Sequence, residues 1–438
     1  MKKTIALLLA LCLLLTGCAG KAASSQDLMK GVKPSGQDKG LSAADGNVPE
    51  TDEVWDNALI ADFGLRLFRA AFVENQNTLL SPVSLLAALG MAANGGSGET
   101  LAQMEAVLGQ STDALNSWYK YGTGYRDDVL CLANGIWFRE DPSLTVKEEF
   151  LQKNADYYGA GLYKAPFDET TLLDINSFVE EHTNGMIKDI LDEIPREAVM
   201  YLVNALAFDA QWQEIYKENQ VHDGTFTTEF GTPQDVQMMW SEENRYLEND
   251  LATGFIKLYG PENGRYAFAA LLPKENVTLR QLLESLDGKQ LQSLLANPQR
   301  VTVQTAIPKF ETEYDTEMSE LLAAMGMPDA FDSGIADFSG LGTSADGNIY
   351  LSRVIHKTFI SVAEKGTKAG AATVVEAACE SALEMEEIKE VILNRPFLYM
   401  IVDTLSNTPI FMGTMVNNGE EEAFTVQYIE VPGIQPAT

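Results

Sequence analysis

The chain has 438 residues, of which 45% are apolar, so it can bury a large core and is long enough for more than one domain. It carries 63 Asp and Glu residues against 31 Lys and Arg residues, a formal net charge of −32. This acidic excess argues against nucleic-acid binding, which needs a basic surface, and favours cationic partners. Three histidines and four cysteines, spread along the chain, predict neither a metal site nor a disulfide framework, and no cofactor is implied.

The first residues have the pattern of a sorting signal. Lys2 and Lys3 precede an apolar run, 5–15, that is too short to span a bilayer as a stable helix. The run closes on Leu15-Thr16-Gly17-Cys18, which resembles a bacterial lipoprotein box. The resemblance implies a signal peptide at 1–17 and lipidation of Cys18, which would anchor the protein to a membrane of the cell envelope, facing outward. An ordinary cleaved signal peptide, and hence a secreted protein, is the alternative.

The rest of the chain divides into a tether and one long domain. Residues 18–51 are rich in Ser, Gly, Lys and Asp and predict a flexible tether, whereas no linker or repeat interrupts 52–417. Helical spacing of apolar residues occurs at 59–71, 85–93, 101–108 and, as a capped helix, at Asp174–Gly185. Strand-like runs occur at 266–272, 301–307, 391–402 and 410–416. Because helices and strands alternate irregularly, we expect an α+β fold with large sheets.

The segment 364–378 consists almost entirely of small residues. Read with a period of two, one phase is small and uncharged: Thr367, Ala369, Ala371, Thr373, Val375 and Ala377. The other phase holds Lys368 and Glu376, as in a strand with one face in a packed sheet and one in water. Alanine and glycine are poor residues for a permanent strand, so we predict a strand that is exposed at first and inserts later. Gly366, Gly370 and the β-branched run 373–375 disfavour a surface helix.

A series of short motifs follows in order along the chain. They are Asn77-Thr-Leu-Leu-Ser-Pro-Val-Ser84, Gly98-Glu-Thr100, Ile175-Asn-Ser-Phe-Val179, Thr183-Asn-Gly-Met-Ile187, Leu202-Val-Asn-Ala205 with Phe208 and Trp212, Ile307-Pro-Lys-Phe310, Ala336-Asp-Phe-Ser339, His356, Asn394-Arg-Pro-Phe397 and Phe411-Met-Gly413. In this order and at these spacings they resemble the serpin family over residues 56–417. Residues 364–373 resemble the hinge of the serpin reactive loop.

The resemblance implies a fold and a mechanism. The fold has a large central β-sheet and two further sheets surrounded by helices, with an exposed reactive loop at about 364–390. The implied function is inhibition of serine proteases, not catalysis: a protease cleaves the loop, and the freed loop inserts into the central sheet before the acyl-enzyme is hydrolysed. The hinge residues carried over from the family are Glu364, Gly366, Thr367, Ala369, Ala371, Ala372 and Thr373.

The family also places a group of polar residues beneath the opening of the central sheet. They are Ser81, Ser84, Asn204 and His356, hydrogen-bonded across two strands. These bonds would have to be exchanged as the sheet opens. A lone histidine is more often a satisfied core residue than a catalyst, so we assign His356 no catalytic role. Trp212 is expected to pack in the core and to form part of the insertion site.

The position of the scissile bond bears on the target. Counted from Gly366 as in the family, the bond is Glu380–Ser381, with a cut after Cys379 as the alternative. No Arg, Lys, Phe, Tyr or Trp occurs from Gly370 until Lys389, which disfavours trypsin-like targets. A cut after Glu380 would suit a glutamyl-specific protease. A cut after Cys379, which follows small residues, would suit an elastase-like or subtilisin-like protease, and we slightly favour this second class. We expect the inhibitor to be a monomer.

Two other functions compete with inhibition. Ser117 and Lys120 match the Ser-x-x-Lys pattern of penicillin-binding proteins, but no Lys-Thr-Gly box or Gly-x-Ser-x-Gly elbow accompanies them. A non-inhibitory serpin that acts as a binding or chaperone-like module is the second alternative, which the small, uncharged phase of the hinge disfavours. The acidic C-terminal extension, 418–438, fits either an added strand or a disordered tail.

Overall fold

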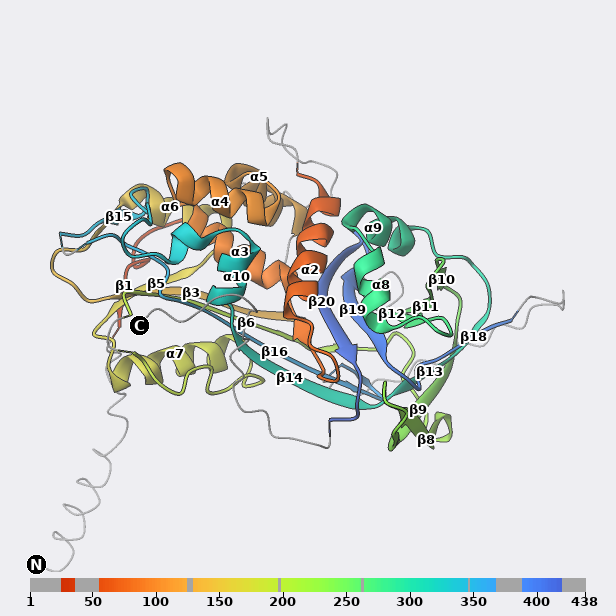
Figure 1. Ribbon diagram of the computed structural model, residues 1–438. Helices are drawn as coiled ribbons and strands as arrows, with labels where there is room; N and C mark the ends of the chain where they lie inside the picture. Colours follow the sequence, from red (N-terminus) through yellow and green to blue (C-terminus); the bar gives the residue numbers. More distant parts are fainter. Residues whose placement is uncertain are drawn as a thin grey trace, which may run out of the picture.

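A large central sheet organises the molecule (Figure 1). The computed structural model describes residues 25–35, 55–123, 129–195, 198–260, 264–345, 347–367 and 388–419. The central sheet has eight strands in the order β1-β5-β3-β6-β16-β17-β7, with β14 paired to β16. Their bounds are Gln26–Asp27 (β1), Gly161–Ala165 (β5), Leu130–Arg139 (β3), Met200–Phe208 (β6), Arg353–Ala363 (β16), Gly366–Thr367 (β17), Ala210–Gln211 (β7) and Phe310–Glu317 (β14).

Three smaller sheets complete the β-structure of the described residues. The six-stranded sheet runs β10-β11-β12-β19-β20-β2, the four-stranded sheet runs β18-β13-β9-β8, and β15 pairs with β4. Their bounds are Tyr246–Glu248 (β10), Ala252–Leu258 (β11), Tyr266–Pro273 (β12), Phe397–Asp403 (β19), Thr408–Met415 (β20), Leu79–Leu80 (β2), Lys389–Ile392 (β18), Val303–Pro308 (β13), Pro233–Glu243 (β9), Val221–Thr227 (β8), Gly342–Thr343 (β15) and Thr145–Val146 (β4). The expected α+β fold, with a large central sheet, two further sheets and surrounding helices, is confirmed, and the pair of β15 and β4 is an addition to it.

Helices cover both faces of the central sheet. α7 lies on one face, and α3, α4, α5, α6 and α10 lie on the other (Figure 1). The helices are Asn57–Ala71 (α2), Pro82–Ala93 (α3), Gly98–Leu108 (α4), Thr112–Ser117 (α5), Glu148–Tyr157 (α6), Glu169–His182 (α7), Leu279–Ser285 (α8), Gly288–Ala296 (α9) and Ser319–Met325 (α10). Every residue of α3 is buried, as expected for a helix enclosed by other elements.

β6 shows why the central sheet needs cover on both sides. All nine of its residues are buried, and they read as a nearly continuous apolar run. Met200, Leu202 and Leu206 pack into the larger hydrophobic core, whereas Val203 and Ala205 pack into a second core that includes residues of α7. Alternate side chains of one strand therefore serve two cores, as in a sheet that is buried on both faces.

Two of the predicted boundaries are wrong. The mid-chain helix begins at Glu169, five residues before the expected start, because the Asp168 carboxylate caps it by accepting from the amides of Thr170 and Thr171. The run 391–402 is not one strand: Pro396 separates β18 from β19, which lie in different sheets. The predicted end of α4 at Leu108 is correct, and Gly109, which follows it, has φ +81°.

The expected flexible tether over 18–51 does not hold for residues 25–35. β1 adds an antiparallel strand to the edge of the central sheet at β5, with Gln26 opposite Lys164 and Asp27 opposite Tyr163. The backbone amide and the hydroxyl of Ser25 both donate to the Asp174 carboxylate on α7, each at 2.9 Å. The segment thus docks through hydrogen bonds that its composition does not reveal, and Leu28 and Met29 pack against the core.

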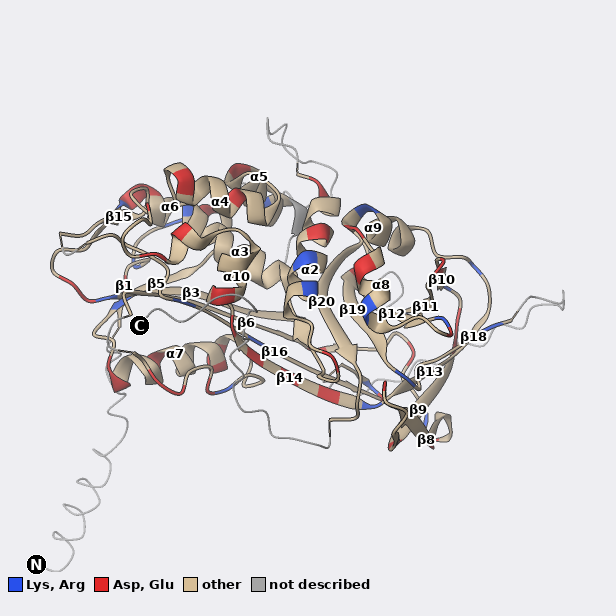
Figure 2. Ribbon diagram, in the orientation of Figure 1, with Lys and Arg blue, Asp and Glu red and all other residues tan. Residues whose placement is uncertain are grey.

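The acidic excess is visible on the surface. Acidic positions recur along α7 and along the outer face of β14, where Glu311, Glu313 and Asp315 are exposed (Figure 2). Among the described residues, no helix is both long enough and apolar enough to cross a membrane.

Candidate functional site

The central sheet has a seam between β6 and β16. These strands run parallel, with Arg353–Phe359 paired to Tyr201–Ala207 in an unbroken register. Beyond the seam the sheet divides, and β17 lies between β16 and β7, antiparallel to both. The position that an inserted strand would occupy is therefore already filled at one end by Gly366 and Thr367 of the hinge.

Beneath the seam lies a buried polar cluster, formed by Ser81, Ser84, Asn204 and His356, which we call the gate cluster. His356 and Asn204 face each other across the seam in the register of β16 and β6. The Nδ1 atom of His356 lies 2.6 Å from Asn204 Oδ1, and Ser84 Oγ donates to the same oxygen at 2.7 Å. Ser81 donates its backbone amide to His356 Nε2 at 3.1 Å. The four residues that the resemblance grouped together are in contact.

The start of α3 brings the two serines to the seam. Ser81 is the N-cap, and its hydroxyl accepts from the Ser84 amide at 3.2 Å while donating to the carbonyl of Ile410 at 2.8 Å. Pro82 follows at the first helical position, where a missing amide hydrogen costs nothing. The Ser-Pro-x-Ser sequence thus starts the helix and brings the hydroxyl groups of Ser81 and Ser84 to the seam.

The hydrogen bonds define the state of His356. Because Nε2 accepts from an amide, Nδ1 carries the ring proton and donates to Asn204. A second ring proton, on Nε2, would point at the amide hydrogen of Ser81 and break that hydrogen bond. The ring also has no exposure to water. Burial lowers the pKa of His356 to about 3. His356 is therefore neutral at physiological pH and serves as a hydrogen-bonding bridge across the seam.

Asn134 is a member of this network that the sequence analysis missed. It lies opposite Asn204 on the next strand, β3, and its Oδ1 accepts from Asn204 Nδ2 at 2.5 Å. The network therefore spans three adjacent strands. The sequence does contain a signal for this role, because Asn134 interrupts the apolar run of β3. A polar side chain buried in such a run is usually hydrogen-bonded.

The divided end of the sheet is held by aromatic residues. Trp212 stacks on Tyr259 with ring centroids 4.2 Å apart. It donates its indole Nε1–H to the carbonyl of Ala363 at 2.8 Å and its backbone amide to that of Lys365 at 3.0 Å. The hydroxyl groups of Tyr259 and Thr367 lie 2.6 Å apart. Trp212 is thus core packing that also holds the hinge, and it lies apart from the gate cluster.

Glu364 fixes the point where the hinge leaves β16. Its carboxylate forms an ion pair with Lys309 at 2.7 Å, and its carbonyl accepts from the amide of Tyr216 at 2.9 Å. Burial opposes ionisation of Glu364 more than any single interaction favours it, but the hydrogen bond from Lys309, a backbone hydrogen bond and the charge of Lys309 together outweigh burial and lower the pKa of this carboxyl. The pair lies at the partly exposed margin of the sheet, where it positions the turn into Gly366.

Gly366 and Thr367 are already inserted. Gly366 has φ +147°, and a Cβ there would lie 2.1 Å from the carbonyl oxygen of Ala210, so only glycine fits. Thr367, the first residue of the small, uncharged phase, is fully buried. The other predicted hinge residues lie outside the described residues, as do the reactive bond and the lipidation site: Ala369, Ala371, Ala372, Thr373, Cys379, Glu380, Ser381 and Cys18.

This arrangement is suited to admitting a strand. An incoming strand that continued β17 would pair antiparallel with β16 and with β6, replacing a parallel pair by two antiparallel ones. Among the described residues, no group of three or more His, Cys, Asp and Glu side chains could hold a metal ion. The chemistry offered by the site is exchange of hydrogen bonds.

Known proteins are similar to this chain in sequence. The serpin family, described as serine protease inhibitors, matches residues 58–418. An uncharacterized serpin-like protein of Thermococcus kodakarensis is 31% identical over 373 residues, which cover 82% of this chain and 84% of that protein. Plasminogen activator inhibitor 1 of Sus scrofa is 27% identical over 86% of this chain and 96% of that protein.

Solved structures are similar as well. The thermophilic serpin tengpin in its native state is 41% identical, with a TM-score of 0.81, over 90% of this chain and 100% of that chain. Tengpin in its latent state is 42% identical, with a TM-score of 0.72, over 84% of this chain and 99% of that chain. The chain belongs to the serpin family. Members of this family are mostly protease inhibitors and not enzymes, although some do not inhibit.

Proposed function

We propose that this protein inhibits serine proteases as a suicide substrate, by inserting its cleaved reactive loop between β6 and β16. The observation that carries the proposal is the position of β17, because the hinge already occupies the end of the place where the loop would insert. The burial of Thr367 supports the inward assignment of its phase, whose next members, Ala369, Ala371 and Thr373, are small enough to follow it.

The register of β17 predicts where the inserted residues come to lie. Thr367 pairs with Val362 on one side and with Ala210 on the other. Each further residue of the loop would pair one residue earlier on both flanking strands. Six residues on, Thr373 would lie between His356 and Asn204. Its hydroxyl could then replace a hydrogen bond that the gate cluster loses when the seam opens.

The energy of this exchange favours insertion. Opening the seam breaks one parallel ladder, and an inserted strand makes two antiparallel ladders in its place. About 12 inserted residues, each contributing roughly 1 kcal/mol in net hydrogen bonding, would supply on the order of 10 kcal/mol. That energy would draw the bound protease along and distort its catalytic site, so that the acyl-enzyme is no longer hydrolysed.

The proposed target is a protease with an elastase-like or subtilisin-like pocket, with a glutamyl-specific protease as the alternative. The two possibilities correspond to a cut after Cys379 and a cut at Glu380–Ser381. A charge mismatch in a specificity pocket costs more than a poorly filled apolar pocket, so one class should be inhibited much better than the other.

We further propose that the inhibitor acts as a monomer at the cell envelope, anchored through a lipid on Cys18, with secretion as the alternative. The lipoprotein-like sequence at 15–18 supports the anchor. Expression with a labelled fatty acid would test it: label in the wild type but not in Cys18→Ser supports lipidation, and no label in either variant favours secretion.

The inhibitory function is tested by incubating residues 19–438 with a panel of serine proteases. We expect a complex that survives boiling in SDS with at least one of them, and mass spectrometry of the released peptide would locate the cut. The same protease with its catalytic serine chemically blocked is the matched control and should form no adduct. If every protease ignores the loop or cleaves it without an adduct, the non-inhibitory binding module becomes the better interpretation.

A further inference from the structure

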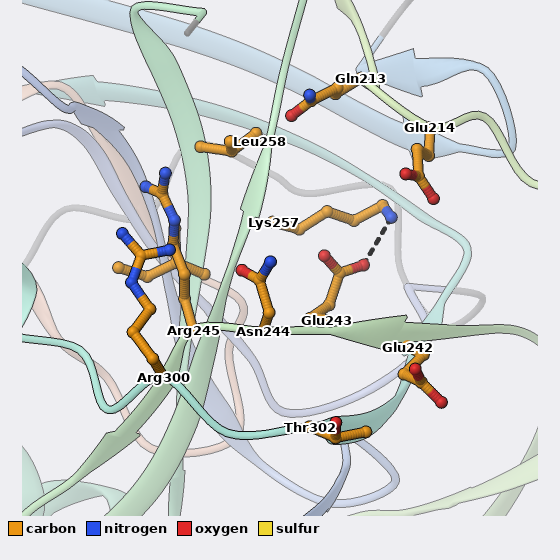
Figure 3. A pocket seen from close by; sticks show the side chains of 11 residues that line it. Gln213, Glu214, Glu242, Glu243, Asn244, Arg245, Lys257, Leu258, Arg300 and Thr302 are labelled. Atoms are coloured by element: carbon orange, nitrogen blue, oxygen red, sulfur yellow. Dashed lines mark hydrogen bonds and ion pairs between the residues drawn. The ribbon is translucent and has the colours of Figure 1, made fainter. Parts of the chain in front are cut away.

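A polar pocket of about 370 Å³ opens beside the four-stranded sheet, between the segment after β9 and the strand β11 (Figure 3). Its lining includes two arginines, Arg245 and Arg300, together with Asn244 and Thr302. Figure 3 shows the two guanidinium groups next to each other. None of these four residues belongs to the gate cluster or to the hinge.

The backbone forces the two arginines together. Tyr246 and Gln299 form an antiparallel bridge, with amide-to-carbonyl hydrogen bonds of 2.9 and 2.8 Å in the two directions. Arg245 precedes the first residue of this bridge and Arg300 follows the second, so they come directly opposite each other. Like charges directly opposite on paired strands are destabilising. Burial and the charge of Arg300 both lower the pKa of Arg245.

Neither guanidinium group has a hydrogen bond or an ion pair with another described residue. The chain nevertheless has twice as many acidic as basic residues. By contrast, Arg66 is paired with Asp62, Arg265 with Asp403, and Arg280 with Glu74. The neighbouring carboxylate of Glu243 is already bound to Lys257 at 2.7 Å.

We propose that Arg245 and Arg300 form a binding site for a small oxyanion, a phosphate or carboxylate group. Guanidinium groups bind such oxygens through parallel hydrogen bonds, and an anion between them would replace repulsion by attraction. The other end of the pocket carries the carboxylates of Glu214 and Glu242 (Figure 3). Those charges would repel a long polyanion, so the site selects a compact ligand whose far end is neutral or cationic.

The site is tested by titrating the intact protein with inorganic phosphate and with acetate in a calorimeter, at an ionic strength matched with NaCl. We expect saturable binding of at least one anion. Binding of phosphate alone or of acetate alone would identify the preferred oxyanion, and both outcomes support the site. A long polyphosphate should bind no better, per phosphate group, than inorganic phosphate.

Variants separate this site from general charge effects. Arg245→Gln and Arg300→Gln should each weaken binding about tenfold or more, as expected for loss of a hydrogen bond between charged groups. Arg245→Lys should bind with intermediate affinity, since lysine keeps the positive charge but cannot donate two parallel hydrogen bonds. Arg280→Gln is the matched control and should bind like the wild type. Absence of saturable binding, or equal affinity in the double Gln variant, would overturn the proposal whether or not the protein inhibits proteases.

Discussion

Thr367→Arg places a cation at the first inward position of the hinge. Thr367 is fully buried, and its hydroxyl lies 2.6 Å from that of Tyr259. Burying an unpaired cation costs several kcal/mol, and loss of the hydrogen bond adds about 1 kcal/mol. The uncleaved variant avoids this cost by withdrawing β17 from the sheet, whereas insertion must bury the cation again. If about 4 kcal/mol of the cost is present in the transition state for insertion, insertion slows about a thousandfold. Hydrolysis of the acyl-enzyme would then be faster than insertion of the loop.

The assay follows adduct and cleaved inhibitor on SDS gels at several inhibitor-to-protease ratios. We expect Thr367→Arg to be cleaved at the normal rate but to give little adduct, so that the inhibitor becomes a substrate. Thr367→Val is the matched control, because it keeps the shape and removes only the hydroxyl, and it should still form the adduct. Undiminished trapping by Thr367→Arg would refute the inward assignment of Thr367 or the trapping mechanism itself.

Four further outcomes are expected. The pKa of His356 is about 3 in the folded state and about 6.5 in the unfolded state, so the unfolded state binds the proton first as the pH falls. The free energy of unfolding should therefore fall by about 2 kcal/mol from pH 7 to pH 5 because of His356 alone. Urea unfolding of His356→Gln should show a smaller fall, and an equal fall would contradict this account. Cleavage within 378–385 should raise the unfolding temperature by tens of degrees in a thermal scan, whereas equal temperatures would argue against insertion. Asp174→Asn weakens both hydrogen bonds from Ser25 and should destabilise the docked segment by about 1–3 kcal/mol. The measurement is hydrogen exchange of the amides at 25–35, which should become faster. Unchanged exchange would show that β1 docks without the hydrogen bonds to Asp174. Glu380→Arg should abolish inhibition of a glutamyl-specific protease and change inhibition of an elastase-like one only modestly, and the reverse result would exclude a cut after Cys379.

Hydrophobic spacing and resemblance together predicted much of the fold. The apolar spacing at 59–71 corresponds to α2, and Ser81-Pro-Val-Ser84 marks the start of α3, because caps and apolar stripes are local properties of a sequence. The start of α7 was placed late because Asp168 and Asp174 are both acceptable N-caps, and only the backbone of the folded chain selects between them.

Features that depend on pairing could not be read from the sequence. Asn134 joins the gate network only because the register of β3 and β6 places it opposite Asn204. Arg245 and Arg300 meet only through the bridge between Tyr246 and Gln299, which are far apart in the chain. The same holds for β1, whose contacts are mostly made by its backbone. Register between distant segments is a tertiary property, set by the whole core.

The central claim is that the loop enters the seam in the register set by β17, and a crystal structure of the protein cleaved within 378–385 tests it most directly. The account predicts that β6 and β16 are separated by a new strand, antiparallel to both, with Thr373 between His356 and Asn204. A cleaved structure in which Tyr201–Ala207 still pairs with Arg353–Phe359 would contradict it.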